Sequence, residues 1–202
     1  MLDLDFSRYQ GLIFDLDGTL IDSMPYHVKA WQQAAAEHGY MNLDPQFIYH
    51  RGGYSSRNIV LDLQKEGCEV GNVKEFVARK VELYRANLKN VPLFPQVFKV
   101  LTDAKERGAQ ISIGTGTQRI NVVDVLELHN ISHLIDFIVS ADDVTQHKPQ
   151  PHTYLKAMEL MGLTCEQCLV VEDGRPGILA AAATHMDCLV VDNDQFVQLN
   201  KG

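Results

Sequence analysis

The sequence predicts an α/β protein built on a parallel, doubly wound sheet, with a helical lobe inserted after the first strand. Five short apolar runs support this, since strands buried on both faces of a sheet are apolar almost throughout. They cover residues 11–15, 110–114, 137–140, 168–172 and 188–192. Helical patterns separate the last four runs, and strands that alternate with helices favour a parallel sheet.

The segment between the first two runs has a different pattern. Residues 23–88 show helical periodicity and no convincing strand, with Val28, Trp31 and Ala35 on one apolar face and a longer face over residues 73–88. Pro92 and Pro95 mark the return to the sheet. We therefore expect two domains, one from residues 1–22 and 93–202 and the other from the insertion, residues 23–92.

Composition limits the function classes. The chain has 202 residues, of which 46% are hydrophobic and 22% charged, which suits one core plus a small lobe. The formal net charge of −8 argues against nucleic acid or an anionic membrane as a partner. Because the first residues are acidic and hold no signal-length apolar run, we expect a cytoplasmic protein. Cys165 and Cys168 lack the spacing of a zinc site and are expected to be reduced.

Acidic residues follow two of the apolar runs. Asp15-Leu-Asp17-Gly-Thr-Leu comes directly after the first, and Glu172-Asp173 ends the fourth. Open α/β sheets build their sites at the carboxyl ends of their strands, so these four carboxylates should meet at one edge. Without a cation they would repel one another and protonate, whereas a hard divalent ion accepts such oxygens.

These motifs, together with Thr115 after the second run and Lys148 in a K-P-x-P sequence, resemble the four motifs of the haloacid dehalogenase superfamily. The resemblance implies a Rossmann-like core and a phosphoric monoester hydrolase that uses Mg²⁺. By resemblance, the metal binds the Asp15 carboxylate, the Asp17 backbone carbonyl and Asp173, with Glu172 in or near the shell.

The same resemblance implies a mechanism. Asp15 attacks phosphorus and forms an aspartyl-phosphate. Asp17 protonates the leaving alcohol and then deprotonates the attacking water. Lys148 offsets negative charge on Asp15 and on the phosphoryl oxygens.

The loop after the second run is expected to bind the phosphoryl group. The Thr115 hydroxyl and the Gly116 N–H can donate to its oxygens, and Thr117 is counted with Gly116 as a substrate-binding residue. A nucleotide-binding loop is excluded, because a dinucleotide fingerprint needs a third glycine where Arg119 stands, and no Gly-Lys-Ser/Thr follows.

The insertion has the position of a C1-type cap of the superfamily, which closes over small soluble substrates. Residues 22–31 resemble a run found in β-phosphoglucomutases and their phosphatase relatives, and His27 falls on their active-site histidine. Residues 53–57 resemble a cap loop whose arginine contacts the substrate; we assign that role to Arg57, with Arg51 as the rival. His185 stands where the family often has glycine, at an expected left-handed helix end.

The whole pattern resembles bacterial fructose-1-phosphate phosphatases most, so we expect hydrolysis of a small sugar phosphate, with fructose 1-phosphate as the first candidate. The partner is a small phosphorylated metabolite, and the protein is expected to be a monomer or weak dimer. The first alternative is a β-phosphoglucomutase, whose cap lysine the sequence does not place among Lys80, Arg85 and Lys89. The second is a sugar-phosphate-binding protein without turnover, which should lack one of the catalytic groups that this chain retains.

Overall fold

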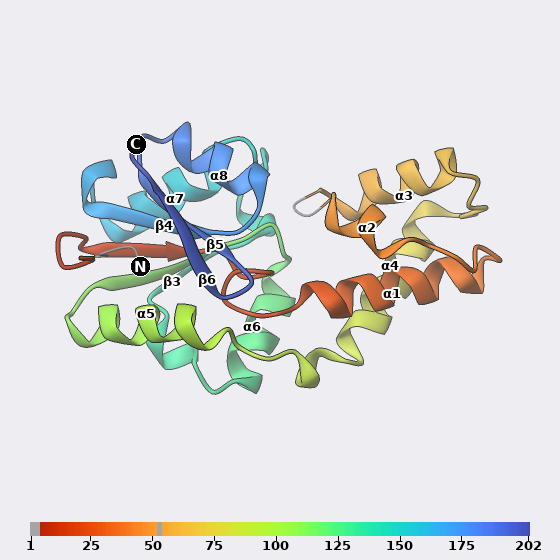
Figure 1. Ribbon diagram of the computed structural model, residues 1–202, viewed down its shortest axis with the longest axis horizontal. Coiled ribbons are helices and arrows are strands. Elements are labelled where there is room, and N and C mark those ends of the chain that lie inside the picture. The colour runs from red at the N-terminus through yellow and green to blue at the C-terminus, as the bar shows by residue number, and fades with distance from the viewer. Residues whose placement is uncertain (1–4, 52–53) are drawn as a thin grey trace. The chain divides into compact units, whose positions relative to one another are not determined.

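The chain forms two compact units. A computed structural model describes residues 5–51 and 54–202 (Figure 1). The larger unit joins the chain up to Asp22 to Pro92–Gly202, and the smaller unit covers Ser23–Val91. Because the larger unit is a sheet covered by helices and the smaller is helical, the predicted fold class is confirmed.

A single six-stranded sheet forms the centre of the larger unit, in the order β3-β2-β1-β4-β5-β6. Neighbouring strands among β1–β5 are parallel, and β6 runs antiparallel to β5. The bounds are β1 (Gly11–Phe14), β2 (Gln110–Gly114), β3 (Phe137–Val139), β4 (Cys168–Glu172), β5 (Asp187–Asp192) and β6 (Gln195–Asn200). The five predicted strands therefore form within one residue of their predicted bounds.

The sequence analysis missed β6. This edge strand has no buried residue and pairs only with β5, so it lacks the apolar run by which the other strands were found. Asn193 and Asp194 have positive φ angles of 46° and 65°, as a tight hairpin turn requires. The Asp194 carboxylate also accepts from the backbone N–H groups of Gln96, at 2.9 Å, and Val97, at 3.1 Å, and so caps the helix that begins at Pro95.

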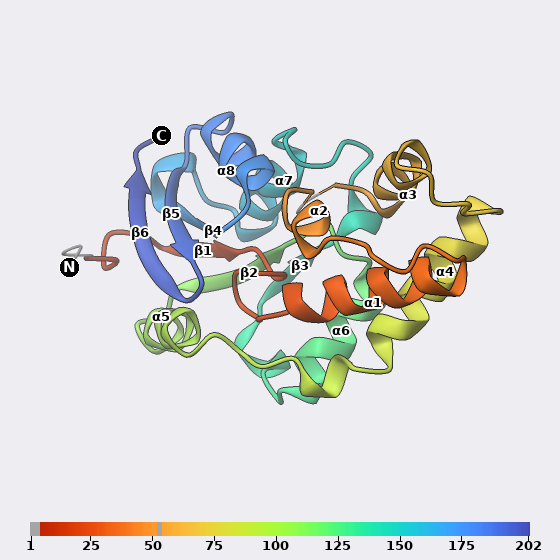
Figure 2. The same cartoon turned by 45° about the vertical axis from the view of Figure 1, so that its right-hand side comes forward.

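Helices cover both faces of the sheet. Figures 1 and 2 show α7 and α8 on one face and α5 and α6 on the other. The bounds are α5 (Pro95–Glu106), α6 (Arg119–Leu128), α7 (His152–Met161) and α8 (Arg175–Ala182), with short 3₁₀ turns η2 (Ser132–Leu134), η3 (Ala141–Asp143) and η4 (Cys165–Gln167). His185 follows α8 with a φ of 58°, so the predicted left-handed conformation is confirmed.

The described residues of the smaller unit form four helices and a 3₁₀ turn that pack together. They are α1 (Met24–Glu37), α2 (Pro45–Tyr49), α3 (Ser56–Lys65), α4 (Val73–Arg85) and η1 (Leu88–Asn90). Trp31 of α1 and Phe76 of α4 stack with ring centroids 6.1 Å apart, and both are almost fully buried. Ser55 and Asn72 cap α3 and α4 by accepting from backbone N–H groups in the first turns.

In the described part of the chain, no helix has the length and apolar character needed to cross a membrane. All four cysteines are free thiols, as Cys165 and Cys168 were expected to be.

Candidate active site

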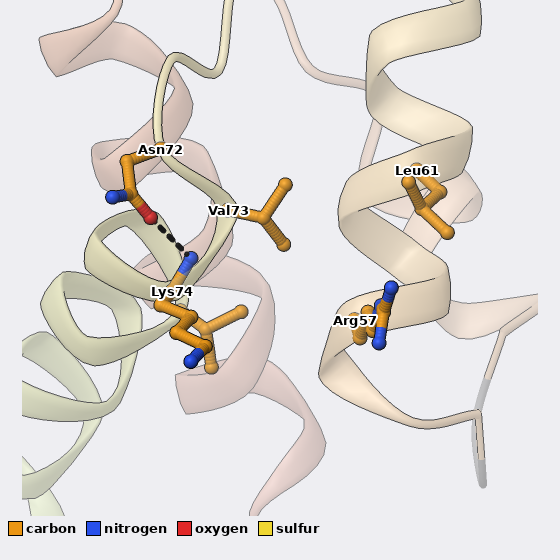
Figure 3. A pocket seen from close by; sticks show the side chains of 6 residues that line it. Arg57, Leu61, Asn72, Val73 and Lys74 are labelled. Carbon is orange, nitrogen blue, oxygen red and sulfur yellow. Dashed lines mark hydrogen bonds between the residues drawn. The ribbon is translucent and has the colours of Figure 1, made fainter.

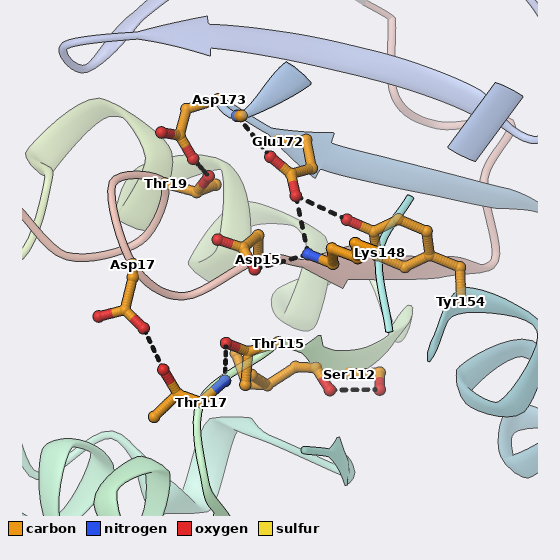
Figure 4. A network of polar contacts seen from close by, with 12 residues as sticks. Asp15, Asp17, Thr19, Ser112, Thr115, Thr117, Lys148, Tyr154, Glu172 and Asp173 are labelled. Atoms are coloured by element: carbon orange, nitrogen blue, oxygen red, sulfur yellow. Dashed lines mark hydrogen bonds and ion pairs between the residues drawn. The ribbon is translucent and has the colours of Figure 1, made fainter. Parts of the chain in front are cut away.

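The candidate site lies where three neighbouring strands end. β1 stands between β2 and β4 and is paired in register with both, so the residues that follow these strands are brought together. Asp15 follows β1, Thr115 follows β2, and Glu172 is the last residue of β4. The Asp15 N–H donates to the Val171 carbonyl at 3.0 Å, which holds the first of these residues against β4. Figure 4 shows the resulting polar network.

A buried lysine joins two of the carboxylates. The Lys148 Nζ lies 2.7 Å from Asp15 Oδ1 and 2.7 Å from Glu172 Oε1, and its side chain is only 7% exposed. Burial alone would lower the pKa of Lys148, but the charges of Asp15 and Glu172 outweigh it and leave the pKa above its ordinary value. Lys148 is therefore a permanent cation at this site.

Tyr154 of α7 also contacts this part of the site. Its hydroxyl donates to Glu172 Oε1 at 2.9 Å, and the Lys148 Nζ lies 4.7 Å from the centre of its ring. Burial, followed by the nearby negative charge of Glu172, raises the pKa of Tyr154 well above its usual range, so the phenol stays a donor. The sequence analysis did not identify Tyr154.

Three carboxylates are close enough to share a cation. Oxygens of Asp15, Glu172 and Asp173 all lie within 4.8 Å of one another. Burial and the neighbouring negative charges outweigh Lys148, so the pKa of Asp15 lies well above its usual range and that of Asp173 rises to about 7. Since one ammonium offsets only part of the charge, the donor set fits a hard divalent ion such as Mg²⁺.

The three carboxylates are not equivalent toward such an ion. Both oxygens of Glu172 are engaged by the protein, Oε1 by Lys148 and Tyr154 and Oε2 by the Gly174 N–H at 2.7 Å. Asp15 and Asp173 each bond the protein through Oδ1, in the case of Asp173 to the Thr19 hydroxyl at 2.6 Å. This suits Asp15 and Asp173 as direct ligands, with Glu172 as a neighbouring charge.

Two glycines make this arrangement possible. A Cβ on Gly177 of α8 would lie 1.6 Å from Glu172 Oε1, so the glutamate occupies the space that any other residue would fill. Gly18 has a φ of +86°, and a Cβ there would lie 2.4 Å from Asp173 Oδ2. Both positions exclude side chains because a carboxylate of the cluster rests on them.

The Asp17 carboxylate is outside the three-carboxylate cluster. Its Oδ2 accepts a hydrogen bond from the Thr117 hydroxyl, while the Thr115 Oγ1 accepts from the Thr117 N–H at 3.1 Å. The metal role expected for Asp17 concerned its backbone carbonyl alone and remains a proposal.

In the smaller unit, His27 meets a buried lysine. Lys80 of α4 is 5% exposed, and its Nζ lies 2.8 Å from Nδ1 of His27 on α1. Since an ammonium can only donate, Nδ1 accepts this hydrogen bond. The His27 ring stacks on Tyr84 at 3.9 Å, and the Lys80 Nζ lies 5.2 Å from the centre of the Trp31 ring. Lys80 falls at helical spacing within the apolar face of residues 73–88, a signal that could have distinguished it from the other candidate cap cations.

The two rival arginines have different surroundings. Arg51 donates to Asp62 Oδ2 at 3.0 Å and to the Phe47 carbonyl at 2.9 Å, so it is held within the unit. Arg57 is exposed and lines an apolar groove between α3 and α4, shown in Figure 3. The groove residues are Arg57, Leu61, Asn72, Val73, Lys74 and Val77. Gly53, part of the predicted cap loop, lies outside the described residues.

Comparison with known proteins agrees with this geometry. A family model described as haloacid dehalogenase-like hydrolase matches residues 12–191. Fructose-1-phosphate phosphatase YqaB of Escherichia coli K12 is 33% identical over 190 residues, which cover 92% of this chain and 98% of that protein. Hexitol phosphatase A of the same organism is 28% identical over 192 residues, covering 92% of this chain and 84% of that protein. A crystal structure of a haloacid dehalogenase-like hydrolase from Bacteroides fragilis superposes with a TM-score of 0.82 at 24% identity, covering 94% of this chain and 90% of that one.

Gly177→Ala should disturb the site by displacing Glu172. The added methyl must displace Glu172 and so break its contacts with Lys148 and Tyr154, at a cost of about 1–3 kcal/mol in unfolding free energy. Denaturant unfolding measures this change. Ala182→Ser, which adds one atom to an exposed position of the same helix, is the control. Equal stability of the two variants would contradict the packing described here.

Magnesium should stabilise the protein more at alkaline pH. Because the pKa of Asp173 is raised from 3.8 to about 7, the metal-free folded state holds this proton more tightly than the unfolded state. The resulting stabilisation is complete below about pH 4 and is lost as the pH rises through 7. A bound cation replaces the proton, so Mg²⁺ added to EDTA-treated protein should raise the Tm more at about pH 8 than at about pH 5.5. The same rise at both pH values would argue against this site, and Asp173→Asn should reduce the rise.

Proposed function

We propose, from the premise that this chain belongs to the haloacid dehalogenase-like hydrolase family, that it is a Mg²⁺-dependent phosphatase of small sugar phosphates with Asp15 as nucleophile. The predicted family and hydrolase class are confirmed by the family model and the relatives. The observation that carries the proposal is the Asp15–Lys148–Glu172 ion network, with Asp173 close enough to share a cation with Asp15.

The first chemical step uses Asp15 and Asp17. A carboxylate oxygen of Asp15 attacks phosphorus, a bond forms between them, and the bond from phosphorus to the sugar oxygen breaks. Asp17 gives its proton to that oxygen, so the sugar leaves as an alcohol. In the second step a water molecule attacks the aspartyl-phosphate, its proton passes to Asp17, and phosphate and free Asp15 result.

The rest of the site binds and orients the phosphoryl group. When bound by Asp15, Asp173 and the Asp17 carbonyl, Mg²⁺ supplies positive charge that offsets the phosphate and the carboxylates. Lys148 supplies a fixed cation beside Asp15, and the Thr115 hydroxyl and the Gly116 N–H, which follow β2, are the proposed donors to phosphoryl oxygens. Glu172 positions Lys148 and also accepts hydrogen bonds from Tyr154 and the Gly174 N–H.

The smaller unit is proposed to be the cap that selects the substrate, and the larger unit the catalytic core. Residues 23–91 contain nine basic and seven acidic side chains, whereas the rest of the chain contains nine and nineteen. A cationic lobe in an acidic protein suits an anionic substrate. His27 and Lys80 together, and Arg57, are its candidate contacts, and a sugar phosphate offers both hydroxyl and phosphate acceptors to them.

The proposed substrate class follows from the activity of a similar protein. The Escherichia coli protein that covers almost the same length is a fructose-1-phosphate phosphatase, so fructose 1-phosphate is the first compound to test. A β-phosphoglucomutase remains the second candidate, because the Lys80–His27 pair provides the kind of cap lysine that such an enzyme needs. Phosphate release without any glucose bisphosphate activator favours the phosphatase, and strict dependence on that activator favours the mutase. The retained catalytic groups give no support to a binding protein without turnover.

Asp15→Asn should lower turnover of fructose 1-phosphate about a thousandfold or more, because an amide is a poor nucleophile and a poor metal ligand. Steady-state phosphate release measures it, and the Tm shows whether the variant is folded. Asp103→Asn, which changes a surface carboxylate paired with Lys99 on α5, should leave turnover unchanged. Wild-type activity of Asp15→Asn would refute the assignment of the nucleophile.

Substitutions in the cap should affect sugar phosphates more than aryl phosphates. His27→Gln and Lys80→Met should each lower kcat/KM for a favoured hexose phosphate about 10-fold or more, because they remove contacts to the sugar. p-Nitrophenyl phosphate has no such sugar, so its kcat/KM should change less. Lys65→Met, at a side chain that is 75% exposed on α3, is the control. An equal loss for both substrates would mean that the pair acts on the phosphoryl group or on folding instead.

A further inference from the structure

The loop after β2 is fixed in place by contacts from both sides. The Thr117 carbonyl accepts from the Ala141 N–H at 3.0 Å, and the Thr117 N–H donates to Thr115 Oγ1 at 3.1 Å. Two residues further along, Arg119 donates to Asp143 Oδ2 at 2.7 Å and so ties the start of α6 to η3. The backbone of Thr117 therefore has little freedom, and its side chain starts from a fixed position.

The Thr117 hydroxyl is directed to Asp17. It donates to Asp17 Oδ2, as Figure 4 shows, from a partly buried position. Asp17 lies within a turn closed by the hydrogen bond from the Leu20 N–H to the Leu16 carbonyl at 3.0 Å. A hydrogen bond from a hydroxyl to a carboxylate is among the stronger kinds, and here it joins two rigid segments.

We infer that Thr117 is a positioning residue for Asp17, a role that rests on the proposed function. By holding Oδ2, the hydroxyl fixes the rotation of the carboxyl group about its Cβ–Cγ bond and hence the direction of Oδ1. Oδ1 is then the oxygen that exchanges a proton with the leaving group and with water. This differs from the expectation that Thr117 binds the substrate directly.

The hydroxyl fits both protonation states of Asp17. When Asp17 has given its proton to the leaving sugar oxygen, Thr117 donates to the carboxylate and stabilises its charge. When Asp17 has taken a proton from the attacking water on Oδ1, Oδ2 is the carbonyl oxygen of the carboxylic acid and still accepts from the Thr117 hydroxyl, so the contact is unchanged. The proton count is unchanged, because Thr117 itself gives up no proton.

The inference predicts a dependence on the leaving group. An alkyl leaving oxygen needs a well-directed acid, whereas p-nitrophenolate leaves without one. Thr117→Val, which keeps the shape and removes the hydroxyl, should lower kcat/KM for a hexose phosphate about 10-fold to 100-fold. For p-nitrophenyl phosphate kcat/KM should change by less than about 3-fold, because it reports only the steps up to the aspartyl-phosphate. Thr117→Ser, which keeps the hydroxyl, should restore most of the hexose phosphate activity.

Three controls make the test decisive. Thr102→Val removes a hydroxyl that bonds the Lys99 carbonyl on the surface of α5 and should change neither substrate. The Tm of each variant, compared with the wild type, detects a folding defect. Asp17→Asn is measured in parallel: wild-type hexose phosphate turnover in that variant would overturn the role proposed for Asp17 itself.

Other outcomes would overturn the inference. An equal fall for both substrates in Thr117→Val would show that the hydroxyl binds the phosphoryl group. Equal losses in Thr117→Val and Thr117→Ser would show a packing role. Loss of hexose phosphate activity in Asp17→Asn, without loss in Thr117→Val, would leave the proposed function standing and remove Thr117 from it.

Discussion

The site depends on one interaction, the buried Lys148 ammonium between Asp15 and Glu172. Carboxylates at a dry sheet edge are costly to ionise, and the desolvation of a buried ion pair can exceed the Coulomb attraction that it gains. The arrangement persists because the remaining lone pairs of Glu172 are satisfied by Tyr154 and the Gly174 N–H. Lys148 is thereby held by the protein itself beside Asp15, the proposed nucleophile, which is what preorganised electrostatic stabilisation requires.

The surrounding packing follows from this network. Glu172 lies directly over α8, so residue 177 has no space for a side chain. Tyr154 lies against the end of β2, where a Cβ on Gly114 would come within 3.2 Å of its ring. A tyrosine, a glutamate and two glycines from four different elements are thus fitted to one lysine, and a change at any of them should reach the nucleophile through Lys148.

The sequence was sufficient for the sheet and for the groups that carry charge. Apolar runs located β1–β5, and the polar residues at the ends of these strands, Asp15, Thr115 and Glu172, follow from the rule that parallel strands end at one edge. β6 was not predicted because it is polar and lies at the edge of the sheet. Tyr154 and Gly177 were missed for another reason: their roles depend on which side chain they touch across the fold, and helical periodicity gives only the face on which they lie. The sequence assigned the substrate contact to Arg57 with Arg51 as the rival, and it did not reveal that Arg51 is bound to Asp62 and to the Phe47 carbonyl.

The raised pKa values of Asp15 and Asp173 connect the metal, the proton and the substrate. Burial and mutual repulsion raise the pKa of both groups when no cation is present, and a protonated carboxyl is neither a good nucleophile nor a good metal ligand. Binding of a divalent cation must displace that proton, so metal affinity and pH are linked. Under the proposed function, a phosphate dianion meets less repulsion once the cation is bound, so the event that deprotonates Asp15 also makes the site more attractive to the substrate. Under the same proposed function, the raised pKa values in the metal-free site therefore weaken Asp15 as a nucleophile until a divalent cation is bound.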